Sequence, residues 1–182
     1  MRLIAGKWRG RKVAFFAAPG LRPTPDRVRE TLFNWLAPII EGANCLDLFA
    51  GSGALGIEAL SRGARRVTLV ENNSAVAECL QSQLQLLGAD NAEVVRAEAR
   101  HYLAGTAQCF DIVFLDPPYQ SHFVQPCIDR LAMGGWLVPG AWVYFETARD
   151  ETPPDLPPGW VVQRHKTAGQ VAYYLVRSDA PA

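Results

Sequence analysis

The sequence lacks any apolar stretch close to the roughly 20 residues that a membrane-spanning helix requires, although 49% of its 182 residues are hydrophobic. It also lacks the apolar core of a secretory signal, because no long hydrophobic run follows Arg2. A membrane protein and an exported precursor are therefore not expected. The length and composition predict a globular protein with one sizeable core.

The cysteines are too far apart to indicate a disulfide framework or a metal site. Cys45, Cys79, Cys109 and Cys127 are widely separated and contain no Cys-x-x-Cys pair. Such spacing favours reduced thiols in a cytoplasmic protein and predicts no bound metal.

An excess of either charge is also absent, since 18 basic and 18 acidic side chains cancel. The balance hides an asymmetry. Residues 1–31 hold eight basic and two acidic side chains, a net charge of +6, whereas the remainder holds ten and sixteen, a net charge of −6. A basic end on an acidic body predicts that one face meets a polyanion.

The first 40 residues differ in pattern from the rest. "MRLIAGKWRGRKVAFF" predicts two short strands joined by a turn. "PTPDRVRETLFNWL" predicts a helix, with Thr24 as its cap, Pro25 in the first helical position and Pro38 beyond its end. We expect a basic N-terminal extension over residues 1–40 and a second, larger domain over residues 41–182.

From residue 44 onward, apolar strands alternate with helices. Strands are predicted over residues 44–50, 65–71, 92–98, 110–116 and 141–147, and helices over residues 53–63, 73–88 and 123–133, with a short one near residue 102. This alternation is typical of an α/β fold with a parallel sheet covered on both faces. "WVVQRHK" and "VAYYLVR", joined by "TAGQ", predict a final antiparallel hairpin.

A glycine-rich turn follows the first of these strands. Gly51-x-Gly53-x-x-Gly56 lies between a strand and a helix, where glycines let a ligand approach the backbone and the helix N-terminus. Glu71 ends the next strand, 20 residues after Gly51, a spacing that suits hydrogen bonds to ribose hydroxyls. The turn predicts a nucleotide-binding domain rather than a tight turn without a ligand.

Two further acids separate S-adenosylmethionine from a dinucleotide as the ligand. Asp47, at the end of the first strand, would face a pyrophosphate badly but would suit an ammonium group. Asp116, Pro117, Pro118 and Tyr119 end the fourth strand, and a nicotinamide enzyme has no need of them. We therefore expect S-adenosylmethionine as the cofactor and a nicotinamide oxidoreductase as the weakest alternative.

The tetrapeptide suits methyl transfer to the exocyclic amine of a nucleobase. That amine is a poor nucleophile because its lone pair is delocalised into the ring. The Asp116 carboxylate and the Pro117 carbonyl can accept its two N–H bonds, and proline keeps the loop stiff. Tyr119 can stack on the base, so catalysis would depend on orientation and electrostatics without a metal.

These residues resemble a known family. The glycine turn, followed by Asp-Pro-Pro-Tyr, looks like class I amino-methyltransferases with a Rossmann-like sheet. "RLIAGKWRGRKV", "LRPTPDRVRETLFNWL", "CLDLFAGSGALGIEALSRGA" and "AGQVAYYL" resemble the bacterial small-subunit (16S) ribosomal RNA guanine-N2 methyltransferases from about residue 2 to residue 177.

The resemblance implies a set of cofactor residues within a catalytic domain over residues 41–182. Glu71 would hold the ribose, Glu98 would lie near the adenine amine, and Thr24 and Arg27 would border the methionine end. The residues implied around the methionine part are Asp47, Phe49, Ala50, Gly51, Ser52 and Gly53. Phe49 replaces the glycine of many methyltransferases, but it occurs in the subgroup with Asp-Pro-Pro-Tyr.

The basic extension is the expected RNA contact. The candidate residues are Lys7, Trp8, Arg9, Arg11, Lys12 and Arg22, with Trp8 available either to stack on a base or to pack inside. The predicted partner is small-subunit ribosomal RNA, naked or in a protein-bearing particle, and the chain is expected to act as a monomer. A DNA adenine-N6 methyltransferase and a non-enzymatic RNA-binding assembly factor stay open as alternatives.

Overall fold

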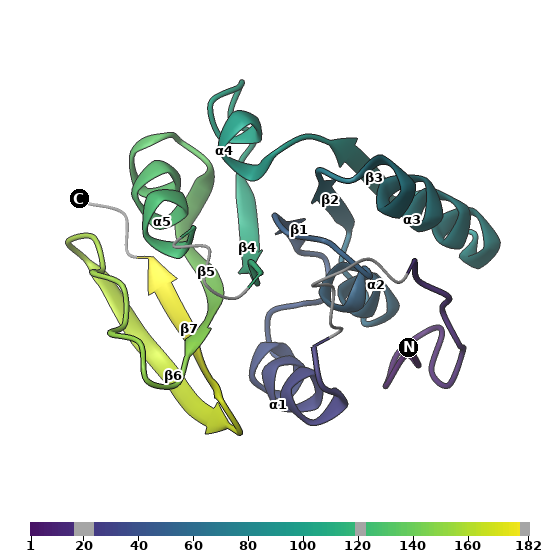
Figure 1. The fold of residues 1–182 in the computed structure, drawn as a ribbon, viewed down its shortest axis with the longest axis horizontal. Coiled ribbons are helices and arrows are strands. Elements are labelled where there is room, and N and C mark those ends of the chain that lie inside the picture. Colours follow the sequence, from purple (N-terminus) through teal and green to yellow (C-terminus); the bar gives the residue numbers. More distant parts are fainter. Residues whose placement is uncertain (17–23, 119–122, 179–182) are drawn as a thin grey trace.

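A seven-stranded sheet forms the centre of the protein (Figure 1). The computed structural model describes residues 1–16, 24–118 and 123–178. The strands are β1 (Asn44–Asp47), β2 (Arg66–Glu71), β3 (Ala92–Arg96), β4 (Phe110–Leu115), β5 (Leu137–Ala148), β6 (Trp160–Ala168) and β7 (Val171–Ser178). The helices are α1 (Asp26–Leu36), α2 (Ala54–Ser61), α3 (Ser74–Leu87), α4 (Ala99–Tyr102) and α5 (Val124–Met133).

The order of the strands confirms the predicted fold class. They lie in the order β3-β2-β1-β4-β5-β7-β6. The first five pair in parallel, and β7 pairs antiparallel with both β5 and β6. The chain thus forms a mostly parallel α/β sheet that ends in an antiparallel hairpin.

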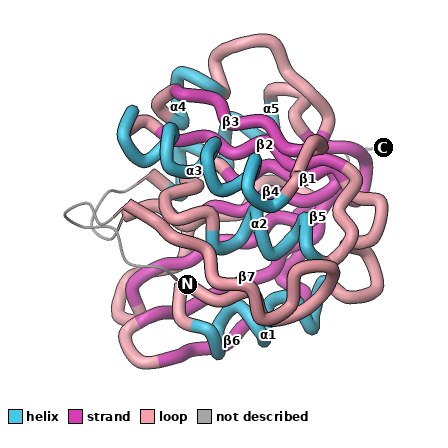
Figure 2. The backbone as a smooth tube through the Cα atoms, turned by 90° about the vertical axis from the view of Figure 1, so that its right-hand side faces the viewer, coloured by secondary structure: helices cyan, strands magenta, loops and turns pink. Residues whose placement is uncertain are grey.

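Helices cover both faces of the sheet, and side chains alternate between two cores. Along β4, Ile112 and Phe114 join the cluster that includes residues of α1, α2 and α3, whereas Val113 and Leu115 join the cluster that includes residues of α4 and α5. Figure 2 shows α3, α2 and α1 following one another across one face of the sheet. Burial on both faces explains why the parallel strands are apolar without interruption.

The start of α1 corrects one detail of the prediction. Pro25 is the N-cap, and no side chain among the described residues caps this helix. The Thr24 hydroxyl, predicted to cap, instead donates to the Asp116 carboxylate at 2.9 Å. The hydroxyl therefore bonds a residue that is distant in the sequence instead of the helix backbone. The local sequence pattern could not show that distant partner.

The N-terminal residues form a hairpin-like loop that is closed by one β-bridge, between Arg2 and Lys12, rather than by two full strands. The Leu3 N–H donates to the Arg11 carbonyl at 3.0 Å, and the Gly10 N–H donates to the Leu3 carbonyl at 2.9 Å. These bonds bring the predicted turn back on itself and leave its basic side chains outside.

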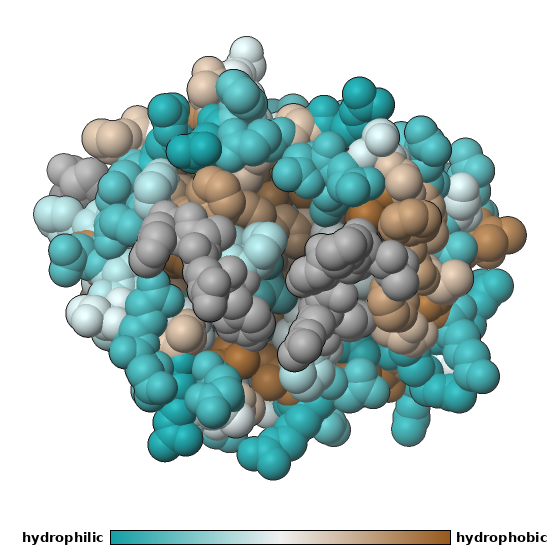
Figure 3. All heavy atoms as spheres, in the orientation of Figure 1, coloured by the Kyte–Doolittle hydropathy of each residue, from teal (hydrophilic) through white to brown (hydrophobic). Residues whose placement is uncertain are grey.

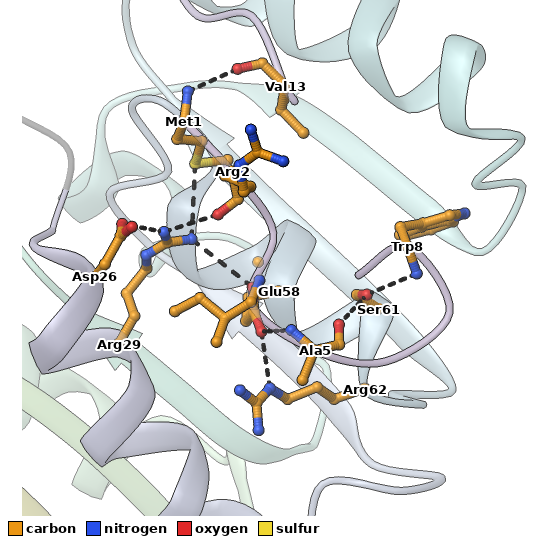
Figure 4. A network of polar contacts seen from close by, with 12 residues as sticks. Met1, Arg2, Ala5, Trp8, Val13, Asp26, Arg29, Glu58, Ser61 and Arg62 are labelled. Carbon is orange, nitrogen blue, oxygen red and sulfur yellow. Dashed lines mark hydrogen bonds and ion pairs between the residues drawn. The ribbon is translucent and has the colours of Figure 1, made fainter. Parts of the chain in front are cut away.

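This loop is attached to α2 through the buried side chain of Glu58 (Figure 4). The backbone N–H groups of Ile4 and Ala5 donate to the two Glu58 oxygens at 2.9 and 3.1 Å. One turn further, the Trp8 N–H donates to the Ser61 hydroxyl at 3.0 Å. Leu3, Trp8 and Val13 also belong to the main hydrophobic cluster, so residues 1–13 share a core with the sheet.

Two arginines balance the Glu58 charge. Arg29, on α1, is fully buried and lies 3.7 Å from Glu58, and Arg62 forms a second ion pair at 2.8 Å. Arg29 also pairs with Asp26 at 2.6 Å and donates to the Arg2 carbonyl at 3.0 Å. A buried carboxylate is tolerated when it is paired and hydrogen-bonded, as here. The network therefore links α1, α2 and the N-terminal loop.

The described surface is mostly polar. Hydrophilic residues cover the rim of the face in Figure 3, and apolar residues show mainly towards its middle. No helix in residues 1–16, 24–118 or 123–178 is both long enough and apolar enough to cross a membrane.

Replacing Gly6 with alanine should detach the N-terminal loop from α2. The added Cβ would lie 1.7 Å from the Ser61 carbonyl oxygen, and Gly6 has φ +80°. We expect Gly6→Ala to lower the free energy of unfolding by at least about 2 kcal/mol. Gly10→Ala is the matched control, because Gly10 has the same φ but no atom within 4 Å of the added Cβ. Urea unfolding of both variants checks this, and equal losses would contradict the close contact.

Candidate active site

The predicted site residues meet at the carboxyl edge of the sheet, between β1 and β4. Asp47 ends β1 and pairs in register with Leu69 of β2 and Phe114 of β4. The chain leaves β1 towards β2 on one side and reaches β4 on the other, so the strand order reverses here. Ligands of open α/β sheets bind at such a switch point.

The glycine turn lies between β1 and α2, as the sequence predicted. Gly51 has φ 49°, and Gly53 has φ 74° as the N-cap of α2. A Cβ on Gly56 would lie 2.8 Å from a Leu69 methyl and 3.1 Å from an Asp47 oxygen. The first two glycines therefore shape the turn, and the third lets α2 approach the sheet closely.

Asp47 lies beneath this turn and is almost completely buried. Its carboxylate accepts the Gly56 N–H at 2.9 Å. Burial raises the pKa of Asp47 to about 7; the Gly56 hydrogen bond opposes this shift, and the charges of Asp116 and Glu71 add to it. An adjacent cation would stabilise the ionised form, as the predicted contact with an ammonium group requires.

Glu71 is oriented by two backbone groups. Its oxygens accept the Gly51 N–H at 3.0 Å and the Asn73 N–H at 2.7 Å. Each carboxylate oxygen has a second lone pair. The side chain can therefore keep both bonds and still accept from a pair of hydroxyls, the chemistry expected for a ribose.

Asp116 follows directly after β4 and is half-buried. Burial raises its pKa to about 6, and the hydrogen bond from Thr24 lowers it in part. Thr24 is buried and holds one carboxylate oxygen in place. Pro117 is buried directly behind it, so a carboxylate and a backbone carbonyl leave the strand together.

The other predicted cofactor residues vary in their surroundings. Ala50 and Ser52 are buried in the turn, and the Phe49 ring lies 6.0 Å from that of Phe123. Arg27 is exposed in the first turn of α1. Glu98 caps α4 by accepting the His101 N–H at 3.2 Å, a local role that the sequence did not indicate. Tyr119 and Arg22 lie outside the described residues.

The basic loop presents most of its predicted contacts to solvent. Lys7, Arg9, Arg11 and Lys12 are exposed. Trp8 is 5% exposed, with the Lys7 ammonium 5.3 Å from the centre of its ring. Of the two alternatives for this ring, the structure favours packing in the core over stacking on a base.

Glu146 and Thr147, which the sequence pattern did not single out, line a cavity together with Pro117 and Pro118. Both lie near the end of β5, the strand beside β4. Both directly follow the apolar run 141–145, just as Asp116 directly follows the apolar strand 110–115. Their position could therefore have indicated them. Among the residues described, no group of three or more His, Cys, Asp or Glu side chains could hold a metal ion.

Comparison with known proteins gives a full-length match. A family model described as "Conserved hypothetical protein 95" matches residues 1–177. The chain is 49% identical over 180 residues to the "Ribosomal RNA small subunit methyltransferase D" of Escherichia coli (strain K12), covering 99% of this chain and 91% of that protein. The chain belongs to this methyltransferase family. The family resemblance seen in the sequence is thereby confirmed.

Solved structures agree with this assignment. The structure of yhhF from Escherichia coli has a TM-score of 0.91 and 49% sequence identity, covering 100% of this chain and 99% of that chain. An RNA methyltransferase from Salinibacter ruber in complex with S-adenosyl-L-homocysteine has a TM-score of 0.68 at 20% identity, covering 88% and 96%. At this identity the second comparison shows only that the fold is shared. The Salinibacter protein was solved with S-adenosyl-L-homocysteine, the demethylated cofactor.

Asp47→Asn should change how stability depends on pH. Asp47 has a raised pKa of about 7, so between about pH 4 and 7 the unfolded chain ionises this group while the folded protein does not. The wild type therefore loses stability as pH rises through this window. Asparagine cannot ionise but can still accept the Gly56 N–H. As pH rises, the free energy of unfolding of Asp47→Asn should therefore fall less steeply than that of the wild type, by up to about 1.4 kcal/mol per pH unit.

Urea unfolding from pH 4.5 to 7.5 measures this difference. Glu78→Gln, at an exposed position on α3, is the control and should follow the wild type. Parallel pH profiles for Asp47→Asn and the wild type would show that burial does not raise this pKa.

Proposed function

We propose that this methyltransferase transfers a methyl group to the exocyclic N2 amine of a guanine in small-subunit ribosomal RNA. S-adenosylmethionine is the cofactor of the family, and ribosomal RNA is the substrate that its full-length relative's name states. The observation that supports transfer to an amine is the half-buried Asp116, held by Thr24 and followed by a prolyl carbonyl beside the glycine turn.

The residues around the turn fit the chemistry of the proposed cofactor. S-adenosylmethionine supplies an electrophilic methyl group on a positively charged sulfur. The Glu71 carboxylate is placed by two backbone N–H groups to accept ribose hydroxyls, and Asp47 lies where a carboxylate favours a cation. Phe49, Ala50, Ser52 and Gly53 complete the proposed methionine site, with Glu98 proposed at the adenine end.

Two acceptors are proposed to activate the amine. The Asp116 carboxylate accepts one N–H of the guanine amine, and the Pro117 carbonyl accepts the other. These bonds draw the nitrogen towards tetrahedral geometry and make its lone pair available to form the new N–C bond. The amine gives up one proton in the reaction, and Asp116, with a pKa of about 6, can take it.

Thr24 is proposed to orient Asp116 rather than to contact the cofactor alone. Its hydroxyl donates to one Asp116 oxygen at 2.9 Å, which fixes the plane of the carboxylate. The other oxygen then faces away from Thr24 and can accept from the amine. Positioning of this kind accounts for a large part of catalysis in reactions that need no covalent enzyme intermediate.

The RNA is proposed to meet the basic loop in residues 1–16. Its exposed Lys7, Arg9, Arg11 and Lys12 carry positive charge near the C-terminal end of α2, where the Lys7 N–H donates to the Ser61 carbonyl. We also propose that the chain consists of an N-terminal extension over residues 1–40 and a catalytic domain over residues 41–182. It is proposed to act as a monomer.

Nucleoside analysis tests the proposed product. The protein is incubated with small-subunit RNA and methyl-labelled S-adenosylmethionine, and the digested RNA is compared with standards. We expect label in N2-methylguanosine. Label in N6-methyladenosine, or in a ring-methylated guanosine, would refute the N2 assignment, and label in DNA only would favour the DNA alternative.

Asp116→Ala should lower turnover by about 100- to 1000-fold while the affinity for S-adenosylhomocysteine changes little, because the lost acceptor acts in the transition state. Asp116→Asn keeps one acceptor oxygen and should lose less. Single-turnover methylation and calorimetry make the two measurements. Near-normal turnover in the alanine variant would exclude this role for Asp116.

Replacing Arg9 and Arg11 with alanine should weaken RNA binding and flatten its dependence on salt. Each phosphate contact to a single strand contributes roughly −0.7 to the slope of log binding constant against log salt concentration. Loss of two contacts should therefore make that slope less negative by about 1 to 1.5. Ala substitutions at Arg164 and Lys166 are the matched control, since these exposed residues lie on β6 at the far edge of the sheet. An unchanged slope and affinity would place the RNA contact elsewhere.

A further inference from the structure

A second buried acid follows the strand next to Asp116. Leu115, the last residue of β4, is opposite Phe145 of β5 in a parallel pair. The next residue along each chain is an acid, Asp116 after Leu115 and Glu146 after Phe145, and neighbouring strands are about 4.8 Å apart. Glu146 is 5% exposed, and the mechanism proposed above gives it no role. Burying a carboxylate is costly unless it is hydrogen-bonded or paired.

Glu146 and Asp116 lie on the same face of the sheet. Consecutive residues of a strand point to opposite faces, so Glu146 shares a face with Tyr144, and Thr147 lies on the other. Tyr144 belongs to the cluster that includes residues of α1. Asp116 accepts a hydrogen bond on that side from Thr24, which comes shortly before α1. The two carboxylates are therefore neighbours on the α1 side of the sheet.

The buried phenol of Tyr144 lies within electrostatic reach of both acids. Its hydroxyl donates to Glu146 at 2.6 Å. Burial raises the pKa of this phenol well above its ordinary value, and the charge of Glu146 and then that of Asp116 raise it further. Both carboxylates must lie near one hydroxyl for their charges to act on it in this way.

The hydrogen bond from Tyr144 favours the ionised form of Glu146. Short O–H bonds to a carboxylate are the strong ones, and Asp116 receives a longer bond from Thr24, at 2.9 Å. Of two neighbouring carboxyl groups, the one with the stronger donor loses its proton first, and its charge then opposes ionisation of the other. Glu146 should therefore ionise first, and Asp116 should titrate beside its negative charge.

Other ionisable groups lie on the elements packed around this pair. Water screens the exposed ones, whereas charges within a buried pair are screened much less. Arg29, the buried cation of α1, is already held by two acids, and the interaction of the buried Asp47 with Asp116 is also repulsive. The charge of Glu146 therefore acts on Asp116 with little screening. The described groups on these elements are the acids Asp26, Glu30, Asp47 and Glu71, the cations Arg27, Arg29 and Lys166, and the phenol of Tyr173.

We propose that Glu146 acts through Asp116: its negative charge keeps Asp116 basic enough to take the proton of the target amine, and the Tyr144 hydroxyl keeps Glu146 ionised. The inference rests on the proposed role of Asp116 in guanine-N2 methylation and adds a second acid to it. The amine nitrogen forms the new N–C bond as the C–S bond breaks and its electron pair goes to sulfur. The nitrogen is then positively charged until one of its protons passes to Asp116, and a more basic carboxylate accepts that proton more readily.

The pH dependence of methylation tests this role. Single-turnover rates at saturating RNA and cofactor should rise with pH as Asp116 ionises. Glu146→Gln removes the neighbouring charge and makes that ionisation easier, so the midpoint should move to lower pH by about 1 to 2 units. The rate at high pH should fall about 3- to 10-fold, because Asp116 is then a weaker base. Glutamine is nearly isosteric and can still accept from Tyr144.

Asp150→Asn is the matched control, because it removes one acid from the turn just after β5, where the side chain is exposed. Its midpoint should follow the wild type, and S-adenosylhomocysteine affinity and thermal melting report whether each variant is folded. An unchanged midpoint in Glu146→Gln, or an equal shift in Asp150→Asn, would overturn the inference. Tyr144→Phe should also lower the midpoint, because Glu146 without its donor keeps its proton to higher pH, and a rise would contradict the part given to Tyr144.

A titration of the wild type avoids any folding defect in a variant. Carboxyl-carbon NMR follows Asp116 and Glu146 directly, with S-adenosylhomocysteine present and without methyl transfer. Because neighbouring acids titrate as a pair, the Asp116 signal should shift in two steps, its own and that of Glu146. One independent step for each acid would overturn the inference. If the wild type forms no N2-methylguanosine, the proposed function fails instead and the titration is unaffected, so the two failures are distinguishable.

Discussion

The hydrogen bond from the Gly56 N–H to the Asp47 carboxylate joins the start of α2 to the end of β1, and the site is arranged around that helix. All eight residues of α2 are buried. The helix begins directly after the glycine turn, with Gly53 as its N-cap. Glu58, two residues after Gly56, binds the N-terminal loop. Arg29 connects Glu58 to α1, and Thr24, just before α1, holds Asp116. The basic loop, the glycine turn and Asp116 are thus all connected, directly or through α1, to α2.

The edge of the sheet next to α2 is acidic, and that charge selects the kind of ligand. Asp47, Glu71 and Asp116 follow or end neighbouring strands. Burial raises the pKa of Asp47 and of Asp116, and the charges of Asp116 and Glu71 raise that of Asp47 further. A pyrophosphate would add negative charge to this edge. A ligand with a sulfonium and an ammonium group relieves the repulsion, which is why a common nucleotide fold here suits a methyl donor.

Local sequence patterns predicted the features that depend on local chemistry. The alternation of apolar strands and helices predicted the sheet, and the spacing of Gly51, Gly53 and Gly56 predicted a turn between a strand and a helix. The role of Glu58 was hidden, because an acid within an apolar helix shows its partners only once a distant segment folds onto it. The Thr24 cap was wrong for the same reason, since its hydroxyl has a partner 92 positions away. Trp8 was ambiguous because its charged neighbours suggested a surface, whereas its ring fills the core.

Burial of Asp116 lowers the stability of the fold but suits the role proposed for this carboxylate. A carboxylate with a pKa of about 6 is destabilised in its ionised form relative to one in water, so the folded protein is less stable at neutral pH than it would be with a neutral residue there. The same destabilisation makes the ionised group a stronger acceptor, which suits its proposed role of accepting an N–H bond and then a proton from the target amine. Thr24 offsets part of the cost and fixes the orientation. The acid is therefore held near the point where it is still ionised at neutral pH but remains basic enough to take a proton.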